Sequence, residues 1–322
     1  MRQALSGLTR WVVAAVLAGL GTGAMPQVLQ HGFLDVNGTF SIIDVPGAVQ
    51  TIATGINNTG QIVGDFSDGR RRHGFLDTGG IFSTIDVPGA TSTSVTGIND
   101  AGQIVGSFTD SSNRSHGFLY SGGIFSIIDV PGATHTSANG INDAGQVVGT
   151  FFSESNTNLS GTVGFLKVGG MFSIIDVPGA EVTLPFGVNN VGQISGSFRD
   201  GTGSHGFLYG GGTFTTIDLP GTVPPGVDTF VGGINNAGQI VGTFVDFNSS
   251  GSFLYSGGIF GRIDVPGFVS DINDAGHIVG VYAVGIVPEL GSLVLFSVGL
   301  LGTRPGLALC SPRRLTSTVP HA

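Results

Sequence analysis

Cysteine, lysine and charge in general are scarce in this chain. Of its 322 residues, one is cysteine and only 10% are charged. The single cysteine, Cys310, excludes an intrachain disulfide, so packing alone must stabilise the fold. Lys167 is the only lysine and glutamate is rare, so the residues that usually build surface helices are missing. Glycine, by contrast, occurs 57 times, and with Ser, Thr, Asn and Phe it predicts an all-β protein of short strands and tight turns.

The few charges are mostly acidic. Residues 31–282 contain 20 acidic and 7 basic residues, a net charge of −13. An acidic surface repels phosphate backbones, so nucleic acid is not expected as a partner. Hydrophobic residues make up 40% of the chain, which is too apolar for intrinsic disorder.

Three phrases recur in step along the chain. The first, I-D-V-P-G, returns at intervals of 42 to 47 residues, and H-G-F-L and G-I-N-x-x-G-Q-I-V-G accompany it. A fixed period of this length indicates a repeat architecture. The six aspartates of the first phrase are Asp44, Asp86, Asp129, Asp176, Asp218 and Asp264.

One repeat contains four short strand patterns. In the second copy they cover residues 94–98, 103–109, 116–120 and 124–130, and they are separated by Asn-Asp-Ala-Gly, a polar loop and Ser-Gly-Gly. Proline at 131 ends the last pattern because it cannot donate a ladder hydrogen bond. Four antiparallel strands in a unit of about 42 residues are typical of a propeller blade.

The order of half-units favours a closed ring. The array begins at His31 with the G-F-L/I-D-V-P-G half and ends at residues 271–282 with the G-I-N/Q-I-V-G half. If these two halves pair, they complete a sixth blade and leave no long free edge. We therefore predict a six-bladed β-propeller over residues 25–285; seven or more blades and a stacked β-solenoid are the alternatives.

The two ends carry targeting patterns. Residues 1–24 combine Arg2 and Arg10, an apolar run over 11–20 and small residues up to Ala24, as in a secretory signal peptide. A short membrane anchor or a buried first strand would be the alternatives. Residues 286–322 hold Val-Pro-Glu at 287–289, an apolar run over 293–301 and a basic pair at 313–314.

Two resemblances follow from these motifs. The tail resembles a PEP-CTERM sorting signal, although Leu290 replaces the usual second proline and Arg304 breaks into the segment. The resemblance implies an exosortase-type sorting partner in a Gram-negative bacterium; a weak anchor or a disordered extension would be the alternatives. Residues 31–282, with G-F-L-Y-S-G-G-x-F-S-x-I-D-V-P-G and G-I-N-D-A-G-Q-I-V-G, resemble the HAF family of extracellular repeats. That resemblance implies export and assigns no ligand or catalytic residue.

The histidines of the H-G-F-L phrase are the first candidate site residues. They recur at His31, His73, His116 and His205, and a ring of imidazoles could hold a transition metal. The other two copies have Val163 and Gly251 at this position, which favours a structural role.

The acidic residues at repeated positions could have either a structural or a ligand-binding role. For the six aspartates of the D-V-P-G phrase we expect hydrogen bonds to the following turn, and a ring binding Ca²⁺ or a sugar is the alternative. In the Asn-x-x-Gly turns the second position is Asp100, Asp143 and Asp274 in three copies and Asn58, Asn190 and Asn236 in the others. This exchange favours turn chemistry over a calcium loop. The basic residues 70–72 are expected to form a solvated loop tip.

We expect from these patterns a secreted or cell-surface binding or scaffolding protein, monomeric and without cofactor or catalytic residues. Its partner would be an extracellular polysaccharide or an envelope protein, bound by the long connections 152–162 and 222–231. A purely structural surface-layer role is one alternative. A propeller hydrolase or lyase acting on polysaccharide is the other, and it would use the irregular acids Glu154, Glu181 and Asp228.

Overall fold

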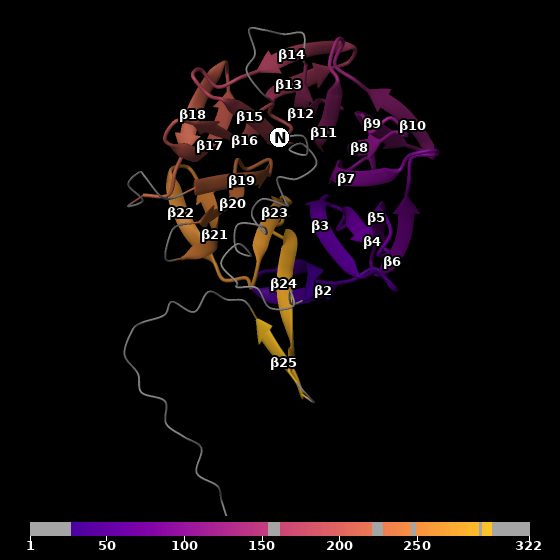
Figure 1. Ribbon diagram of the computed structural model, residues 1–322. Helices are drawn as coiled ribbons and strands as arrows, with labels where there is room; N and C mark the ends of the chain where they lie inside the picture. Colours follow the sequence, from indigo (N-terminus) through magenta and orange to yellow (C-terminus); the bar gives the residue numbers. More distant parts are fainter. Residues whose placement is uncertain (1–26, 154–161, 221–227, 246–248, 290–291, 298–322) are drawn as a thin grey trace, which may run out of the picture.

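The chain forms six four-stranded antiparallel blades arranged around a central axis, as the repeats predict (Figure 1). The computed structural model describes residues 27–153, 162–220, 228–245, 249–289 and 292–297. In each blade the strand before the Asn-x-x-Gly turn lies nearest the axis, and the strand before D-V-P-G lies at the outer rim. The described residues include no helix long and apolar enough to cross a membrane.

Five blades are continuous in sequence. The first two are β3(Gln50–Ile56), β4(Ile62–Ser67), β5(Arg72–Thr78), β6(Ile81–Ile85) and β7(Ser92–Ile98), β8(Ile104–Thr109), β9(Ser115–Ser121), β10(Ile124–Ile128). The third and fourth are β11(His135–Ile141), β12(Val147–Phe152), β13(Val163–Val168), β14(Met171–Ile175) and β15(Val182–Val188), β16(Ile194–Asp200), β17(Gly203–Gly210), β18(Thr213–Ile217). The fifth is β19(Asp228–Ile234), β20(Ile240–Val245), β21(Ser250–Ser256), β22(Ile259–Ile263).

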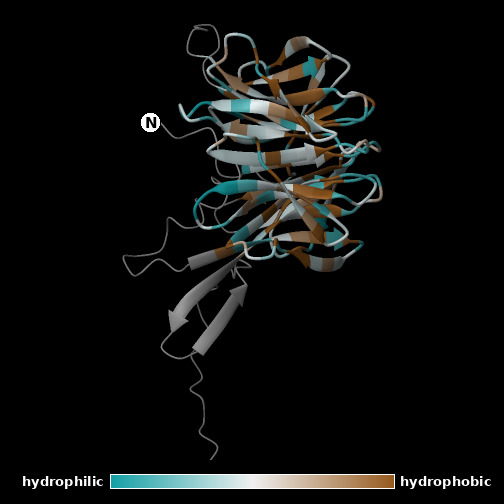
Figure 2. Ribbon diagram, turned by 90° about the vertical axis from the view of Figure 1, so that its right-hand side faces the viewer, coloured by the Kyte–Doolittle hydropathy of each residue, from teal (hydrophilic) through white to brown (hydrophobic). Residues whose placement is uncertain are grey.

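The sixth blade joins the two ends of the array. Its strand order is β2-β1-β24-β23, formed by β1(Gln27–Val36), β2(Thr39–Ile43), β23(Phe268–Ile272) and β24(Ile278–Glu289). β1 and β24 pair antiparallel from Gln27 opposite Ile286 to Asp35 opposite Ile278. The predicted closure by terminal half-units is confirmed. β24 continues beyond the ring, where it pairs with β25(Ser292–Ser297) (Figures 1 and 2).

Tight turns set the register of each blade. The hairpin between β9 and β10 turns on Gly122 and Gly123, with φ angles of 57° and 87°. Both positions of a type I′ turn need positive φ, which glycine adopts without steric cost. After the outer strand, the V-P-G-A segment turns the chain, and the Ala90 N–H donates to the Val87 carbonyl at 3.1 Å. A buried threonine on the following inner strand, Thr93, accepts from the Val87 N–H at 3.1 Å. The same bond recurs at Val45, Val130 and Val177, and it attaches the outer strands of these blades to the next blade.

The hydrophobic core is divided among the blade interfaces. One cluster joins Val63 of the first blade to Val95, Ile104 and Phe118 of the second, and five comparable clusters fill the other interfaces. At the centre of each lies the phenylalanine of H-G-F-L, at most 1% exposed in every copy. Full burial of such a ring stabilises the fold by about 1.5–3 kcal/mol. The polar residues gather in the loops at the edges of the disc (Figure 2).

The glycines inside the second strand of each blade leave room for these phenylalanine rings. A Cβ at Gly106 would lie 2.9 Å from the Phe118 ring and would overlap the carbonyl oxygen of Ser94. Glycines inside strands allow a close approach of other groups to the backbone, and here that approach occurs on the second strand of the blade, not on the strand at the axis. The glycines at the axis are those of G-I-N, since a Cβ at Gly97 would lie 3.1 Å from the Asn139 carbonyl of the next blade.

Candidate functional site

Six asparagines form a closed hydrogen-bonded ring around the axis. In each Asn-x-x-Gly turn the first asparagine is buried, and its Nδ2 donates to the backbone carbonyl of its counterpart in the next blade. The distances lie between 2.9 and 3.1 Å. The bond from Asn273 to Asn57 returns the ring to its start. The members are Asn57, Asn99, Asn142, Asn189, Asn235 and Asn273.

Each of these asparagines uses both ends of its amide. The Oδ1 of Asn99 accepts from the Gln103 N–H at 2.9 Å and closes its own turn. Its Nδ2 also donates to the Gln103 side chain at 2.8 Å. Aspartate would lack the donor and serine could not reach both partners. This double demand explains why asparagine recurs in all six copies.

A second ring runs over the exposed turn residues beside the first. The side-chain Oδ1 of each accepts from the backbone N–H of the preceding copy, as in Asn58 to Asp100 at 2.7 Å and Asp100 to Asp143 at 2.9 Å. Only an acceptor is needed, and Asn and Asp both supply one. The prediction that their exchange reflects turn chemistry is supported by this contact, although the acceptor serves the neighbouring blade. The six members are Asn58, Asp100, Asp143, Asn190, Asn236 and Asp274.

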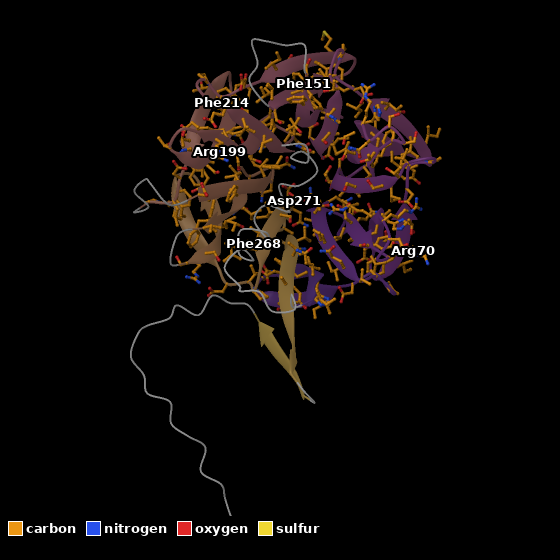
Figure 3. All side chains as sticks on the ribbon, in the orientation of Figure 1. Arg70, Phe151, Arg199, Phe214, Phe268 and Asp271 are labelled. Atoms are coloured by element: carbon orange, nitrogen blue, oxygen red, sulfur yellow. The ribbon has the colours of Figure 1, made fainter. Side chains whose placement is uncertain are left out.

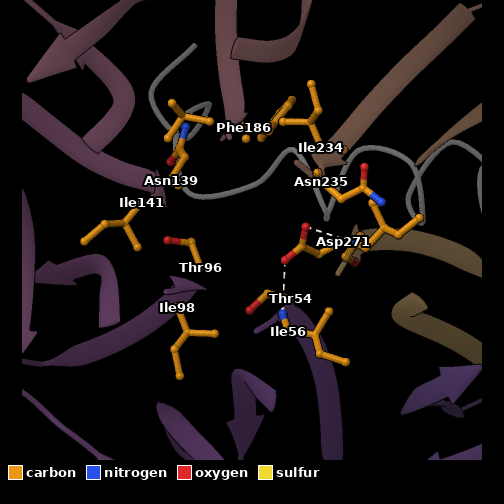
Figure 4. A pocket seen from close by; sticks show the side chains of 18 of the residues that line it. Thr54, Ile56, Thr96, Ile98, Asn139, Ile141, Phe186, Ile234, Asn235 and Asp271 are labelled. Atoms are coloured by element: carbon orange, nitrogen blue, oxygen red, sulfur yellow. Dashed lines mark hydrogen bonds between the residues drawn. The ribbon is translucent and has the colours of Figure 1, made fainter. Parts of the chain in front are cut away.

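Inside the rings lies a cavity of about 370 Å³ on the propeller axis. The inner strands of all six blades line it, so it is the central channel of the propeller (Figure 3). Its wall combines apolar side chains such as Ile98 and Phe186 with hydroxyl and amide groups such as Thr54, Thr96 and Asn139 (Figure 4). A concave, mostly apolar wall with a few fixed polar groups is typical of a small-molecule site.

Asp271 is the exceptional residue of this channel. It occupies the position at which the other copies have Gly55, Gly97, Gly140, Gly187 or Gly233. Its carboxylate accepts from the Ile56 N–H across the blade boundary at 3.0 Å and from the Ile272 N–H at 2.9 Å (Figure 4). Protein encloses the side chain, which reaches solvent through the channel. Burial raises the pKa of Asp271 from 3.8 to about 7, against the lowering effect of the two N–H donors.

Asp65 is a second buried carboxylate, set in the wall between the first two blades. Its oxygens accept from the Val95 N–H at 2.8 Å, from Ser94 Oγ at 3.1 Å and from Arg72 at 3.0 Å. Burial raises the pKa of Asp65 although the Arg72 charge and these bonds oppose the rise. Arg72 therefore departs from the predicted solvated tip, because it begins β5 and turns into the interface. Arg70 lies exposed at the rim, as predicted (Figure 3).

The repeated histidines pair with the repeated aspartates of the same blade. The Nδ1 atoms of His31, His73, His116 and His205 lie 2.7–2.9 Å from the carboxylates of Asp44, Asp86, Asp129 and Asp218. Each imidazole also stacks on an aromatic ring, as His116 does on Phe108 at 5.1 Å. Burial lowers the pKa of His116, but Asp129 and Asp110 outweigh it and raise the pKa. The structural role predicted for the histidines fits these contacts.

The expected bond from each D-V-P-G aspartate to its following turn is a wrong prediction. Where Val163 and Gly251 replace histidine, Asp176 accepts from Thr183 Oγ1 at 3.0 Å and Asp264 pairs with Arg262 at 3.2 Å. In the described ranges, the bonds shown for all six carboxylates go to side chains. The turn is closed by its own backbone instead. Because the six lie after the outermost strands, they do not converge on one site.

Of the acids of the hydrolase alternative, Glu181 and Asp228 belong to the described residues and do not meet in the channel. Glu154 lies outside the described residues. Glu181 is exposed in the turn before β15, and Asp228, at the start of β19, accepts from the Ser204 N–H at 2.8 Å. Neither lines the cavity. Of the predicted contact loops, 154–161 and 222–227 also lie outside the described residues. Among the residues that are described, no group of three or more His, Cys, Asp or Glu is arranged to hold a metal ion.

The sequence analysis missed Asp271 and both rings. A signal for Asp271 is present, because the sixth copy reads D-I-N where the others read G-I-N or G-V-N. The rings carry no comparable signal. An asparagine that closes its own turn and one that also bonds the next blade have the same sequence pattern.

Comparison with known proteins supports the fold. No family model matches the chain. No curated protein matches it either. Among solved structures, a TolB from Agrobacterium tumefaciens is similar with a TM-score of 0.54 and 12% identity, over 81% of this chain and 99% of that one.

Two further structures are similar at lower scores. The β-propeller domain of the Trilobed protease from Pyrococcus furiosus has a TM-score of 0.47 and 10% identity, over 78% of this chain and 77% of that one. A lectin from Aleuria aurantia has a TM-score of 0.44 and 13% identity, over 82% and 99%. By its own sheet order, the chain is a six-bladed β-propeller.

Proposed function

We propose that this protein is an exported, non-enzymatic binding propeller that acts at the cell surface or in the extracellular matrix of a Gram-negative bacterium. The central channel carries the binding part of this proposal. It offers about 370 Å³ walled by six strands, with hydroxyl and amide groups at fixed positions on an apolar surface. The wall is held by two closed hydrogen-bond rings, so the site is formed before a ligand arrives. A preformed site loses little conformational entropy on binding.

Export rests on the sequence. The leader pattern of residues 1–24 and the repeat resemblance both point outside the cytoplasm, and the tail of residues 286–322 would engage an exosortase-type sorting enzyme. An extracellular polysaccharide or an envelope protein would then be the partner. We expect the working form to be a monomer, because the ring closes within one chain.

Fractionation tests the localisation. The full-length gene is expressed with its own leader in a Gram-negative host and followed with an antibody to the purified protein. We expect the protein in the periplasmic, outer-surface or extracellular fraction, and a variant lacking residues 2–20 in the cytoplasm. Cytoplasmic accumulation of the intact form would contradict export.

A glycan array with the purified full-length chain tests the binding role. We expect retention on a subset of glycans without release of products into solution. Product formation would favour the hydrolase or lyase alternative, and a triple variant Glu154→Gln, Glu181→Gln, Asp228→Asn would then show whether those acids carry it. Failure to retain any glycan would leave an envelope protein as the partner and would be followed by crosslinking at the cell surface.

A further inference from the structure

We infer that the central channel is selective for a small organic cation, whose ammonium group is received by Asp271. This inference deepens the proposed binding role, on which it rests, by naming the chemical class of the ligand. It starts from the residue that breaks the repeat. In five copies the residue at this point of the wall is glycine, and in the sixth copy it is Asp271.

The position of Asp271 is not explained by the needs of the fold. Glycine satisfies the same backbone position in five blades, where a side chain would approach the neighbouring inner strand closely. Asp271 fits because its neighbour is Gly233; a Cβ there would overlap the Asp271 carboxylate. The Asp271 side chain thus occupies space that is open because Gly233 has no side chain, and it lines the cavity (Figure 4).

The charge around Asp271 is predominantly negative. The described part of the channel lining contains five carboxylates, those of Asp65, Asp100, Asp143, Asp271 and Asp274, and one guanidinium, that of Arg72. Arg72 is already paired with Asp65 at 3.0 Å. Carboxylates on low-dielectric walls concentrate the field inside a channel and raise the local concentration of cations. Asp271 is therefore left without a cationic partner among the described lining residues.

The carboxylate is also held ready to accept more hydrogen bonds. Each oxygen receives one backbone N–H, from Ile56 and from Ile272, and a carboxylate offers about four acceptor sites. These two donors fix the orientation of the group and leave acceptor capacity for a ligand. An ammonium group supplies both the missing charge and up to three donors. Burial without a counter-charge keeps the pKa of Asp271 near 7, as expected of a carboxylate that awaits a cation.

The wall suits the remainder of such a ligand. Ile56, Ile98 and Phe186 offer apolar surface in the same channel, and Thr54 and Thr96 anchor their hydroxyls on backbone carbonyls at 2.9 and 2.7 Å. The aliphatic part of a compact ligand can pack on these apolar side chains. An anion of the same size would meet the carboxylates, and the described lining residues offer no unpaired cation to receive it.

The test uses three probes that differ only in charge: n-butylammonium, 1-butanol and butyrate. The full-length protein labelled with ¹⁵N is titrated at pH 7.5, and the amide signals of Ile56 and Ile272 are followed because both donate to Asp271. We expect saturable shifts with n-butylammonium, at least about tenfold weaker binding of 1-butanol, and no binding of butyrate. Equal binding of the three probes, or no binding of the amine, would overturn the inference.

Three variants assign the selectivity to one residue. Asp271→Gly restores the residue of the other copies, Asp271→Asn keeps the shape without the charge, and Asp264→Asn removes an exposed carboxylate at the outer rim, away from the channel lining, as the control. We expect both Asp271 variants to lose the preference for n-butylammonium over 1-butanol and Asp264→Asn to change it less than about twofold. An unchanged preference in Asp271→Gly would contradict the assignment. Tighter, Asp271-dependent binding of Ca²⁺ than of the amine would replace the organic cation by a metal ion and would also overturn it.

These outcomes are separable from those of the proposed function. A protein that reaches the cell surface and is retained on glycans, yet shows no charge preference among the three probes, keeps its binding role and loses only the ligand class. A charge-selective channel in a protein that stays in the cytoplasm would overturn export alone.

Discussion

The side chain of Asn273 donates to the backbone carbonyl of Asn57 at 3.1 Å, across 216 residues of sequence. This bond closes the inner asparagine ring at the junction of the sixth and first blades. Phe33 is fully buried in the core between the fifth and sixth blades, and β1 pairs with β24 over a long stretch inside the sixth blade. The ring is thus fastened both at its axis and in its last sheet.

Exchanging an amide for an acid in the inner ring should lower the stability of the protein, whereas the reverse exchange at the adjacent residue of the second ring should leave it almost unchanged. In Asn142→Asp, an oxygen replaces the Nδ2 that donates to the Asn189 carbonyl at 2.9 Å, so two acceptors face each other in a buried place. We expect a loss of about 1–3 kcal/mol in the free energy of unfolding, measured by urea denaturation.

The neighbouring exchange Asp143→Asn is the matched control. Its Oδ1 still accepts from the Asp100 N–H at 2.9 Å, and the bond that its Oδ2 accepts from Asn190 Nδ2 at 2.6 Å is exposed, so water can replace it. We therefore expect a change within about 0.5 kcal/mol. Equal losses in the two variants would mean that the inner ring does not depend on the amide donor.

The glycines that pack against the buried phenylalanine side chains should not tolerate an added methyl group. Gly106→Ala would force the new Cβ against the Phe118 ring and the Ser94 carbonyl, both inside the blade. Overpacking of this kind costs about 1–3 kcal/mol, and more where backbone must move. Thermal unfolding should show a clearly lower Tm, whereas Ser107→Ala, one residue on and only half-buried, should change the Tm little.

The fold of this chain could be predicted in outline because its signals are local and repeated. The turn at Asn99, the Gly122-Gly123 hairpin and the proline after β10 each delimit a strand, and six copies of that pattern fix the blade count. The closing blade followed from the order of half-units. The contacts of the site were not predictable in the same way, because they join residues of different blades. Nothing near Arg72 in sequence indicates that its partner Asp65 is buried behind the next inner strand.

Stability should depend on pH through Asp271. Its pKa in the folded protein, about 7, lies above the ordinary 3.8, so the folded state holds this proton more tightly than the unfolded state. The favourable contribution is therefore complete below pH 3.8 and is lost as the pH rises to 7 and beyond. The charged groups that face the channel, Asp65, Arg72, Asp100, Asp143 and Asp274, are common to wild type and variant and cancel in the comparison.

Asp271→Asn cannot titrate and isolates this effect. Relative to wild type, we expect the variant to gain stability progressively between pH 4.5 and pH 8, measured as the urea midpoint at each pH. A constant difference between the two proteins over that range would show that Asp271 keeps its ordinary pKa.

The composite blade should be required for cooperative folding. A chain that starts at Asn37 lacks β1, so β24 keeps β23 but loses its pairing with β1, and Phe33 is removed from the core between the fifth and sixth blades. We expect this chain to lose its cooperative thermal transition and to bind a dye for exposed apolar surface. A synthetic peptide covering residues 27–43 should restore the transition.

Removal of residues 290–322 is the matched deletion at the other end. It takes away β25, which pairs only with the part of β24 beyond the ring, from Val284 to Glu289. We expect the Tm to stay within a few °C of the intact chain. A comparable loss in both deletions would indicate that the projecting hairpin also stabilises the propeller.

Because the first and last strands share one sheet, the order in which the protein is made has a bearing on how it matures. The opening strand β1 can pair with β2 at once, but its other partner, β24, is synthesised some 250 residues later, and until then the earlier blades form an open row. A chain that crosses a membrane unfolded would meet this condition naturally, since completion would coincide with the arrival of its final strand on the far side.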